Sequence, residues 1–296
     1  MNKREFTEQI KQTLMEKLGD DVLLEDTKVL KNNGICYEGI TIRKKEERIS
    51  PNIYLDALYE RYRLGEPLTK LSDEICSFLE QETFRAGFVA DDFIDFEKMK
   101  DRIVFKLVNL EKNEKLLEDV PYDRFMDLAK VYYYLVPENE EGLVASVLIH
   151  QSHVKIWKTD PEVIRELAAV NTPRLLPPEI IGMKELIEDM AKRLQLPGID
   201  GDSIPMYVLS NERRMNGAAA MAYPGVIREF ALRMESDLYV IPSSIHELIL
   251  VPDNGMMQGM NDFVREVNRT ELDPKDVLAD HVYYFDRRED QLLAIL

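Results

Sequence analysis

Side chains suited to acid–base chemistry gather between residues 241 and 247, where two apolar stretches predicted as strands are joined. Ser243 and Ser244 offer the hydroxyl of a nucleophile. His246 and Glu247 offer a base and a carboxylate to orient it. Because neighbours on a strand point to opposite faces, local spacing alone does not form a triad. In the milder hypothesis His246 and Glu247 act as acid and base towards a ligand, and the alternative is a serine cap beside a hydrogen-bonded core histidine.

A second polar segment, residues 209–225, follows a predicted strand and is rich in turn-forming residues. Loops at strand ends commonly carry function, and the arginines here offer paired donors that match an anion or a carboxylate. The simpler interpretation is a β-turn with Asn216-Gly217 at its corner, and the sequence favours it. If the later strands bring both segments to one pocket, the ligand-binding candidates are Asn211, Arg213, Ser243, Ser244, His246 and Glu247.

Two histidines in the segment His150-Gln151-Ser152-His153 raise the question of a metal site. They would share one face of a helix, point to opposite faces of a strand, or face each other across a two-residue turn. Zinc also requires a third or fourth ligand, which this segment does not provide. We therefore predict no bound metal and interpret the segment as a surface hairpin.

Cysteine and glycine usage gives no sign of a cofactor. Cys36 and Cys76 are far apart and match no CxxC spacing, so we expect reduced thiols rather than a disulfide or a zinc site. None of the 13 glycines falls in a nucleotide-binding pattern after a strand. The sequence thus predicts no cofactor, and the catalytic residues, if there are any, remain unknown.

Composition limits the class of protein and of partner. With 45% hydrophobic and 31% charged residues in 296, the chain can build a packed core. Its 38 Lys and Arg against 55 Asp and Glu give a net charge of -17, which repels nucleic acid and anionic membrane surfaces. Charged residues interrupt Met1–Leu18, and no run of about 18 apolar residues occurs. We expect a soluble cytoplasmic protein whose partner is an unknown protein or small molecule.

The first 92 residues predict a small α+β unit. An opening helix ends at Gly19, and Asn33-Gly34 suits the tight turn of a hairpin formed by 22–30 and 35–42. A second helix is expected from Ser50-Pro51 to just before Gly65. Apolar spacing predicts three helices, with the stripes Phe6, Ile10, Leu14 and Leu18; Tyr54, Leu58 and Tyr62; and Leu68, Leu71, Ile75 and Leu79.

A boundary is predicted within residues 91–101, which gives domains 1–92 and 93–296. Beyond it, strands cluster before a pair of helices and again after it, a pattern that favours an antiparallel or mixed sheet with helices packed on it. The class is therefore α+β. Predicted strands are 102–110, 128–136, 143–149, 154–157, 206–209, 238–241, 245–251, 281–285 and 291–296. Predicted helices start at Asp160-Pro161 and end before Pro173, cover 183–194, start at Pro224, and surround Phe263 and Val267.

Several short motifs resemble a bacterial family of unknown function, domain of unknown function 5688. They are Ile49-Ser50-Pro51-Asn52-Ile53-Tyr54, Asn171-Thr172-Pro173, Asn211-Glu212, Asn216-Gly217-Ala218, Tyr223-Pro224-Gly225 and Pro242-Ser243-Ser244-Ile245-His246-Glu247. The resemblance covers nearly the whole chain. It implies a bacterial cytoplasmic protein and brings no activity, cofactor or catalytic residue with it.

Two classes of function remain open. A non-enzymatic interaction or regulatory protein is favoured by the lack of a strong catalytic spacing and by the acidic composition. The alternative is an enzyme or small-ligand binder whose pocket surrounds Asn211, Ser243, His246 and Glu247. An interaction protein should expose an apolar patch or groove, whereas a ligand binder should gather these side chains in one concave pocket.

Overall fold

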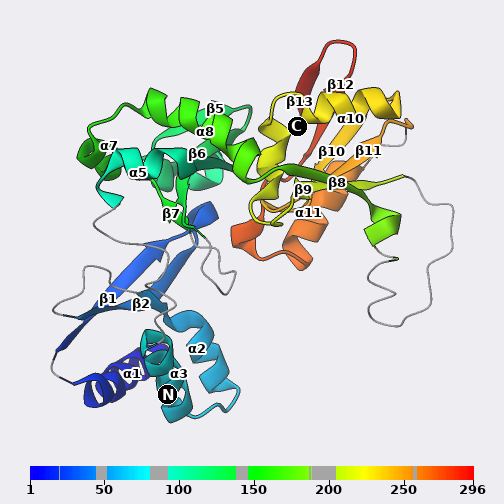
Figure 1. The fold of residues 1–296 in the computed structure, drawn as a ribbon. Coiled ribbons are helices and arrows are strands. Elements are labelled where there is room, and N and C mark those ends of the chain that lie inside the picture. Colours follow the sequence, from blue (N-terminus) through cyan, green and yellow to red (C-terminus); the bar gives the residue numbers. More distant parts are fainter. Residues whose placement is uncertain are drawn as a thin grey trace. The chain divides into compact units, whose positions relative to one another are not determined.

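The computed structural model describes residues 1–19, 21–44, 52–80, 93–137, 146–186, 188, 205–255 and 259–296. These residues form two compact units (Figure 1). The first extends from Met1 to Lys98 and includes Val136 and Pro137, and the second contains Met99–Leu135 and Ser146–Leu296. All pairs of described strands are antiparallel, and the chain also contains helices that pack on these sheets. The predicted α+β class is therefore confirmed. No described helix has the length and apolarity needed to span a membrane.

In the first unit, helices pack against one face of a three-stranded sheet with the order β1-β2-β3. Asn33 and Gly34 have φ of 58° and 70°, which confirms the predicted turn between β1 and β2. A short strand that was not foreseen, β3, ends at Tyr54, and the expected start at Ser50-Pro51 lies outside the described residues. The elements are α1 (Lys3–Leu18), β1 (Val22–Leu30), β2 (Cys36–Lys44), β3 (Asn52–Tyr54), α2 (Leu55–Arg63) and α3 (Leu68–Glu80).

The second unit begins with a four-stranded sheet in which β6 pairs with β4, β5 and β7. One edge of this sheet is covered by a long helix, α8, through two buried polar side chains. The Asn171 Nδ2 donates to the Ile103 carbonyl (3.1 Å), and the Thr172 Oγ1 accepts from the Phe105 N–H (3.0 Å). A short helix, α5 (Phe96–Met99), spans the sequence boundary between the two units. The elements of this part of the second unit are β4 (Ile103–Asn109), α6 (Glu114–Leu117), β5 (Tyr122–Phe125), β6 (Leu128–Leu135), β7 (Ser146–Leu148), α7 (Gln151–Trp157) and α8 (Pro161–Leu175).

The same unit contains a six-stranded sheet with the order β13-β12-β10-β11-β9-β8. Ile227 and Phe230 of α10 are buried, and Val264 of α11 packs with Ile241 and Val282. The elements are β8 (Pro178–Gly182), β9 (Tyr207–Asn211), the 3₁₀ helix η5 (Gly217–Ala222), α10 (Val226–Met234), β10 (Leu238–Pro242), β11 (Leu248–Pro252), α11 (Met260–Thr270), β12 (Val282–Asp286) and β13 (Gln291–Ile295). The hairpin predicted from residues 281–296 is thereby confirmed as β12 and β13.

Two predictions around α7 and α8 are wrong. The predicted strand 154–157 is the second half of helix α7, because an apolar run of four residues does not distinguish a strand from a helical turn. Helix α8 continues through Pro173 to Leu175. Pro173 has no N–H to donate to the Ala169 carbonyl, so the helix continues with one backbone hydrogen bond fewer.

Other boundaries shift by a few residues. The strand predicted from Ile245 starts at Leu248, and the helix predicted from Pro224 starts at Val226 after Gly225, whose φ is 79°. The helix predicted around Phe263 and Val267 is α11, in which Phe263 is exposed and Val264 is buried. The helix predicted at 183–194 begins at Met183, but most of it lies outside the described residues.

Candidate functional site

The pairing of β9 with β11 places the two polar segments side by side. Leu209 is paired with Leu248, so the loop after β9 and the turn before β11 lie at the same end of the sheet. Three hydrogen bonds connect them. The Ser210 Oγ donates to the His246 carbonyl (2.8 Å), and the Asn216 and Ala218 N–H groups donate to the His246 Nδ1 (3.1 Å) and the Ile245 carbonyl (3.3 Å).

Asn211 is fully buried, and within the described part of the chain its side chain hydrogen bonds only with its own loop. Its Nδ2 donates to the Met215 carbonyl (2.8 Å), and its Oδ1 accepts from the N–H groups of Arg213 (3.1 Å) and Met215 (3.3 Å). This is the loop-building use of an asparagine side chain that turn chemistry favours. Asn211 therefore fixes the shape of residues 212–216, in which Arg214 and Asn216 both adopt φ of 52°.

Replacing Asn211 with alanine is expected to lower the free energy of unfolding by about 2 kcal/mol, because buried backbone groups would lose their partners. Urea denaturation followed by the fluorescence of Trp157, the only tryptophan, measures the change. Ser243→Ala is the matched control, since the Ser243 side chain makes one hydrogen bond to the described residues, and that bond is long (3.4 Å). Equal stability of the two variants would show that the Asn211 side chain does not support the loop.

The imidazole of His246 contacts the protein through both ring nitrogens. Since Nδ1 accepts from a backbone N–H, the proton of the neutral ring lies on Nε2, which is 3.7 Å from the Asp276 Oδ1. The Ser244 Oγ accepts the His246 N–H (3.0 Å). Ser243 donates to the Glu247 Oε1 (3.4 Å), and among the described residues no hydrogen bond joins Ser243 to His246. The arrangement therefore lacks the contact that would activate a serine.

The two arginines of the loop point to different neighbours. The Arg214 Nη2 lies 3.1 Å from the Glu179 Oε2 of β8. Burial raises the pKa of the Tyr133 hydroxyl to about 12, and the nearby positive charge of Arg213 opposes this rise. Arg213 is therefore near Tyr133 of β6, whereas Arg214 pairs with a carboxylate of the six-stranded sheet.

His150 and His153 lie at the start of α7, which corrects the predicted surface hairpin. His150 is the N-cap residue, and its N–H donates to the His153 Nδ1 (3.1 Å). The His150 Nδ1 lies 2.7 Å from the Asp119 Oδ2. Burial and the charge of His150 lower the pKa of His153. Within the described ranges, no three His, Cys, Asp or Glu side chains are grouped in a way that could hold a metal ion.

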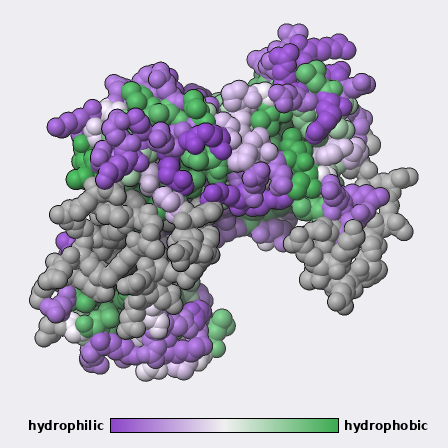
Figure 2. Space-filling view, viewed as in Figure 1, coloured by the Kyte–Doolittle hydropathy of each residue, from purple (hydrophilic) through white to green (hydrophobic). Residues whose placement is uncertain are grey.

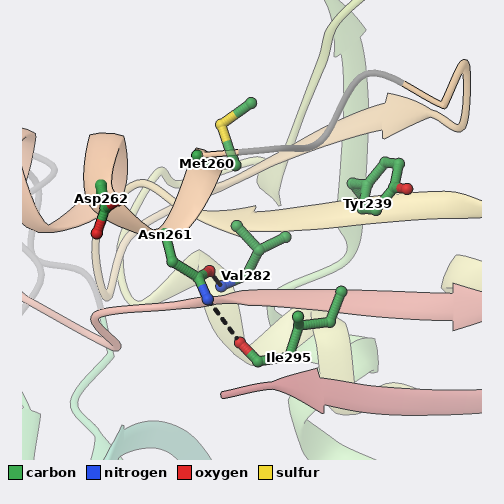
Figure 3. Close-up of a pocket in the computed structure, with 7 residues that line it drawn as sticks. Tyr239, Met260, Asn261, Asp262, Val282 and Ile295 are labelled. Atoms are coloured by element: carbon green, nitrogen blue, oxygen red, sulfur yellow. Dashed lines mark hydrogen bonds between the residues drawn. The ribbon is translucent and has the colours of Figure 1, made fainter.

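Sequence reasoning missed a cavity of about 260 Å³ beside the end of β13 (Figure 3). Its walls come from β10, from β12 with β13, and from the first turn of α11, and they contain Tyr239, Gly259, Met260, Asn261, Asp262, Val282 and Ile295. Apolar residues reach the surface over the six-stranded sheet, bordered by hydrophilic ones (Figure 2). The alternation of apolar Leu293 and Ile295 on an exposed strand is the sequence signal that could have indicated this surface.

A buried polar cluster was also missed. Tyr283 donates its hydroxyl to Asp127 (3.0 Å), and the Nε2 of His281 lies 3.5 Å from the same carboxylate. Burial alone would raise the pKa of Asp127, but His281 and Tyr283 hold it below its ordinary value. Asp127 and Tyr283 are 156 residues apart, so no local pattern reveals their contact.

Comparison with known proteins identifies the family. The model of a family of unknown function, DUF5688, matches residues 3–287. The chain belongs to this family. No curated protein and no solved structure gives a significant match. In this DUF5688 member, Asn171-Thr172 covers a sheet edge and Asn216-Gly217 packs against His246, so these motifs have structural roles. Residues 49–51 of another motif lie outside the described residues.

Proposed function

We propose that this DUF5688 protein is a non-enzymatic interaction protein that binds an extended segment of a partner protein along β13. The observation that supports this most directly is the position of β13 at the edge of the six-stranded sheet, where β12 is its only neighbour among the described strands. Leu293 and Ile295 on this strand are 44% and 39% exposed. An edge strand offers a row of backbone donors and acceptors to an added strand, and adjoining pockets select its side chains.

The contrast with β4 supports an open edge. In β4 the outward Ile103 carbonyl and Phe105 N–H are bonded by Asn171 and Thr172, so that edge is closed to another strand. On β13 the Asn261 side chain donates to the Ile295 carbonyl near the end of the strand (2.9 Å), and the same side chain accepts from the Val282 N–H of β12. Natural sheets usually protect a long apolar edge, so an edge left open is a reason to expect a partner.

The net charge favours a basic partner over a second copy of the chain. Two molecules of charge -17 repel each other, whereas a segment rich in Lys and Arg is attracted. The same charge is the reason why we propose no nucleic acid as partner. A cytoplasmic location in a bacterium is part of the proposal, supported by the finding that Cys36 and Cys76, the two cysteines of the chain, are not joined in a disulfide.

The ligand-binding alternative has less support. Its best observation is the convergence of the two polar segments around the partly exposed His246. However, Asn211 is engaged within its loop, and both ring nitrogens of His246 contact protein groups. Interaction through β13 uses a strand whose apolar Leu293 and Ile295 are already partly exposed, and it is therefore preferred.

The proposal is tested with octapeptides selected from a random phage-displayed library on the wild-type protein. We expect a selected peptide to bind Leu293→Lys at least about tenfold more weakly, because the new charge replaces an apolar contact and repels basic peptides. Leu232→Lys, at an exposed leucine of α10, is the control and should bind normally. Methylating single backbone nitrogens of the peptide should weaken binding at every second residue.

Two results would refute strand addition. One is a library that yields no peptide whose binding depends on Leu293. The other is a methylation pattern that repeats every three to four residues, because this is the period of a bound helix.

A further inference from the structure

Resting on the proposed function, we infer that the cavity beside β13 accepts one lysine or arginine side chain of the bound segment. The aliphatic stem lies against Val282 and Ile295, and the cationic head faces Asp262. A lysine or arginine at this position of the bound segment would then determine which partners bind to β13.

The floor of the cavity is held in place by one side chain. Asn261 bridges β12 and β13, since its Oδ1 accepts from the Val282 N–H (2.9 Å) and its Nδ2 donates to the Ile295 carbonyl (2.9 Å) (Figure 3). Both polar atoms of this amide are thus already bonded. Val282 and Ile295 face each other across the strands, so they present adjacent apolar side chains to whatever enters.

The size of the cavity suits a single side chain. About 260 Å³ is below the range of roughly 300–1,000 Å³ that is typical of sites for drug-sized ligands. A long unbranched side chain reaches such a space from an adjacent strand and keeps its charged end near water. A neighbouring strand on β13 carries alternate side chains on the face of Leu293 and Ile295, and the cavity lies beside Ile295.

The charge at the cavity favours a cation. Among the described residues that line it, only Asp262 carries a full charge. Its partner is Arg265 at 2.9 Å, an i,i+3 pair in which both side chains are more than half exposed. Pairs of this kind contribute little, so an incoming cation can share or replace the arginine.

The same sheet face continues into aromatic and acidic groups. Leu293 faces Tyr284, which faces Tyr239 on β10, and the two tyrosine rings lie 5.1 Å apart. The Tyr284 hydroxyl lies 3.1 Å from Asp237 and 3.0 Å from Asp253, so two carboxylates share one donor proton. Tyrosine faces attract cations, and this end of the surface carries excess negative charge. A basic segment is therefore complementary to both ends of the surface beside β13.

The test is a charge exchange with a selected octapeptide that contains one essential Lys or Arg. We expect about fivefold weaker binding to Asp262→Asn and a larger loss with Asp262→Lys. Changing the basic residue of the peptide to Glu should restore binding to Asp262→Lys and weaken binding to the wild type. Glu266→Lys is the matched control, since it makes the same charge change one turn further along α11, outside the residues that line the cavity.

The outcomes separate this inference from the proposed function. The cation site is supported if the Glu-containing peptide restores binding to Asp262→Lys but does not improve binding to Glu266→Lys. Equal effects of Asp262→Lys and Glu266→Lys would overturn it, because the preference would then reflect overall charge. If Leu293→Lys abolishes binding while Asp262→Lys leaves peptide selection unchanged, the cation site is wrong and strand addition remains. If Leu293→Lys has no effect, both proposals fail.

Discussion

Replacing Gly217 with alanine is expected to lower the free energy of unfolding by about 3 kcal/mol or more, at the upper end of overpacking effects. A Cβ at this position would lie 2.1 Å from the Ser210 Oγ, 2.5 Å from the His246 carbonyl oxygen and 2.8 Å from the Asn211 N. Two of these three atoms belong to the backbone, so a side-chain rotation cannot relieve the clash. The loop after β9 can approach the turn before β11 this closely only because residue 217 has no side chain.

Gly182→Ala is the matched control for this prediction. Gly182 ends the edge strand β8, and the nearest atom to a new Cβ there is 3.9 Å away. Urea denaturation monitored by Trp157 fluorescence should show a much lower midpoint for Gly217→Ala and a midpoint close to wild type for Gly182→Ala. Midpoints that coincide for the two variants would mean that the loop and the turn are not packed as described.

The local parts of the fold could be predicted from the sequence. The stripe of Phe6, Ile10 and Leu14 defines α1, and these three residues are buried. Asn33-Gly34 likewise specifies its turn, because both residues tolerate positive φ. Such elements depend on residues fewer than about ten positions apart, and their periodicity is therefore visible in the chain.

Elements whose position depends on tertiary contacts could not be predicted equally well. In α8 the apolar Val163 and Val170 are exposed, whereas the buried face includes Asn171 and Thr172, because that face must satisfy the backbone of β4. A polar residue that faces a sheet edge has no signature in apolar periodicity. The buried face of this helix therefore combines the apolar Ile164 and Ala168 with two polar residues that apolar periodicity does not mark.

The candidate site was only partly accessible to sequence reasoning. Strand order was not known in advance, yet the expectation that strand ends bring Asn211 near residues 243–247 agrees with the contacts of Ser210 and Asn216 with His246. The hydrogen-bond partners of these side chains could not be predicted. Whether an asparagine binds its own loop or a ligand depends on the loop conformation, which the sequence does not specify. The importance of β13 was missed because its hairpin is a local feature, whereas its place at the sheet edge is a property of the whole sheet.

Replacing Asp127 with alanine is expected to destabilise the protein by about 3 kcal/mol at pH 7, because the buried Tyr283 hydroxyl and His281 imidazole would lose a charged partner. Since the pKa of Asp127 is lower in the folded protein than its ordinary value of 3.8, its carboxylate contributes stability above that pH. The contribution is lost as the pH falls through the folded pKa.

The difference in unfolding free energy between wild type and Asp127→Ala should therefore shrink as the pH falls below 3.8. Urea denaturation at a series of pH values measures it. Tyr283→Phe completes a double-mutant cycle, in which we expect the two substitutions to cost less together than the sum of their separate effects. Full additivity, or a difference that stays constant down to pH 3, would show that Asp127 is not the charged acceptor that joins the β5–β6 turn to β12.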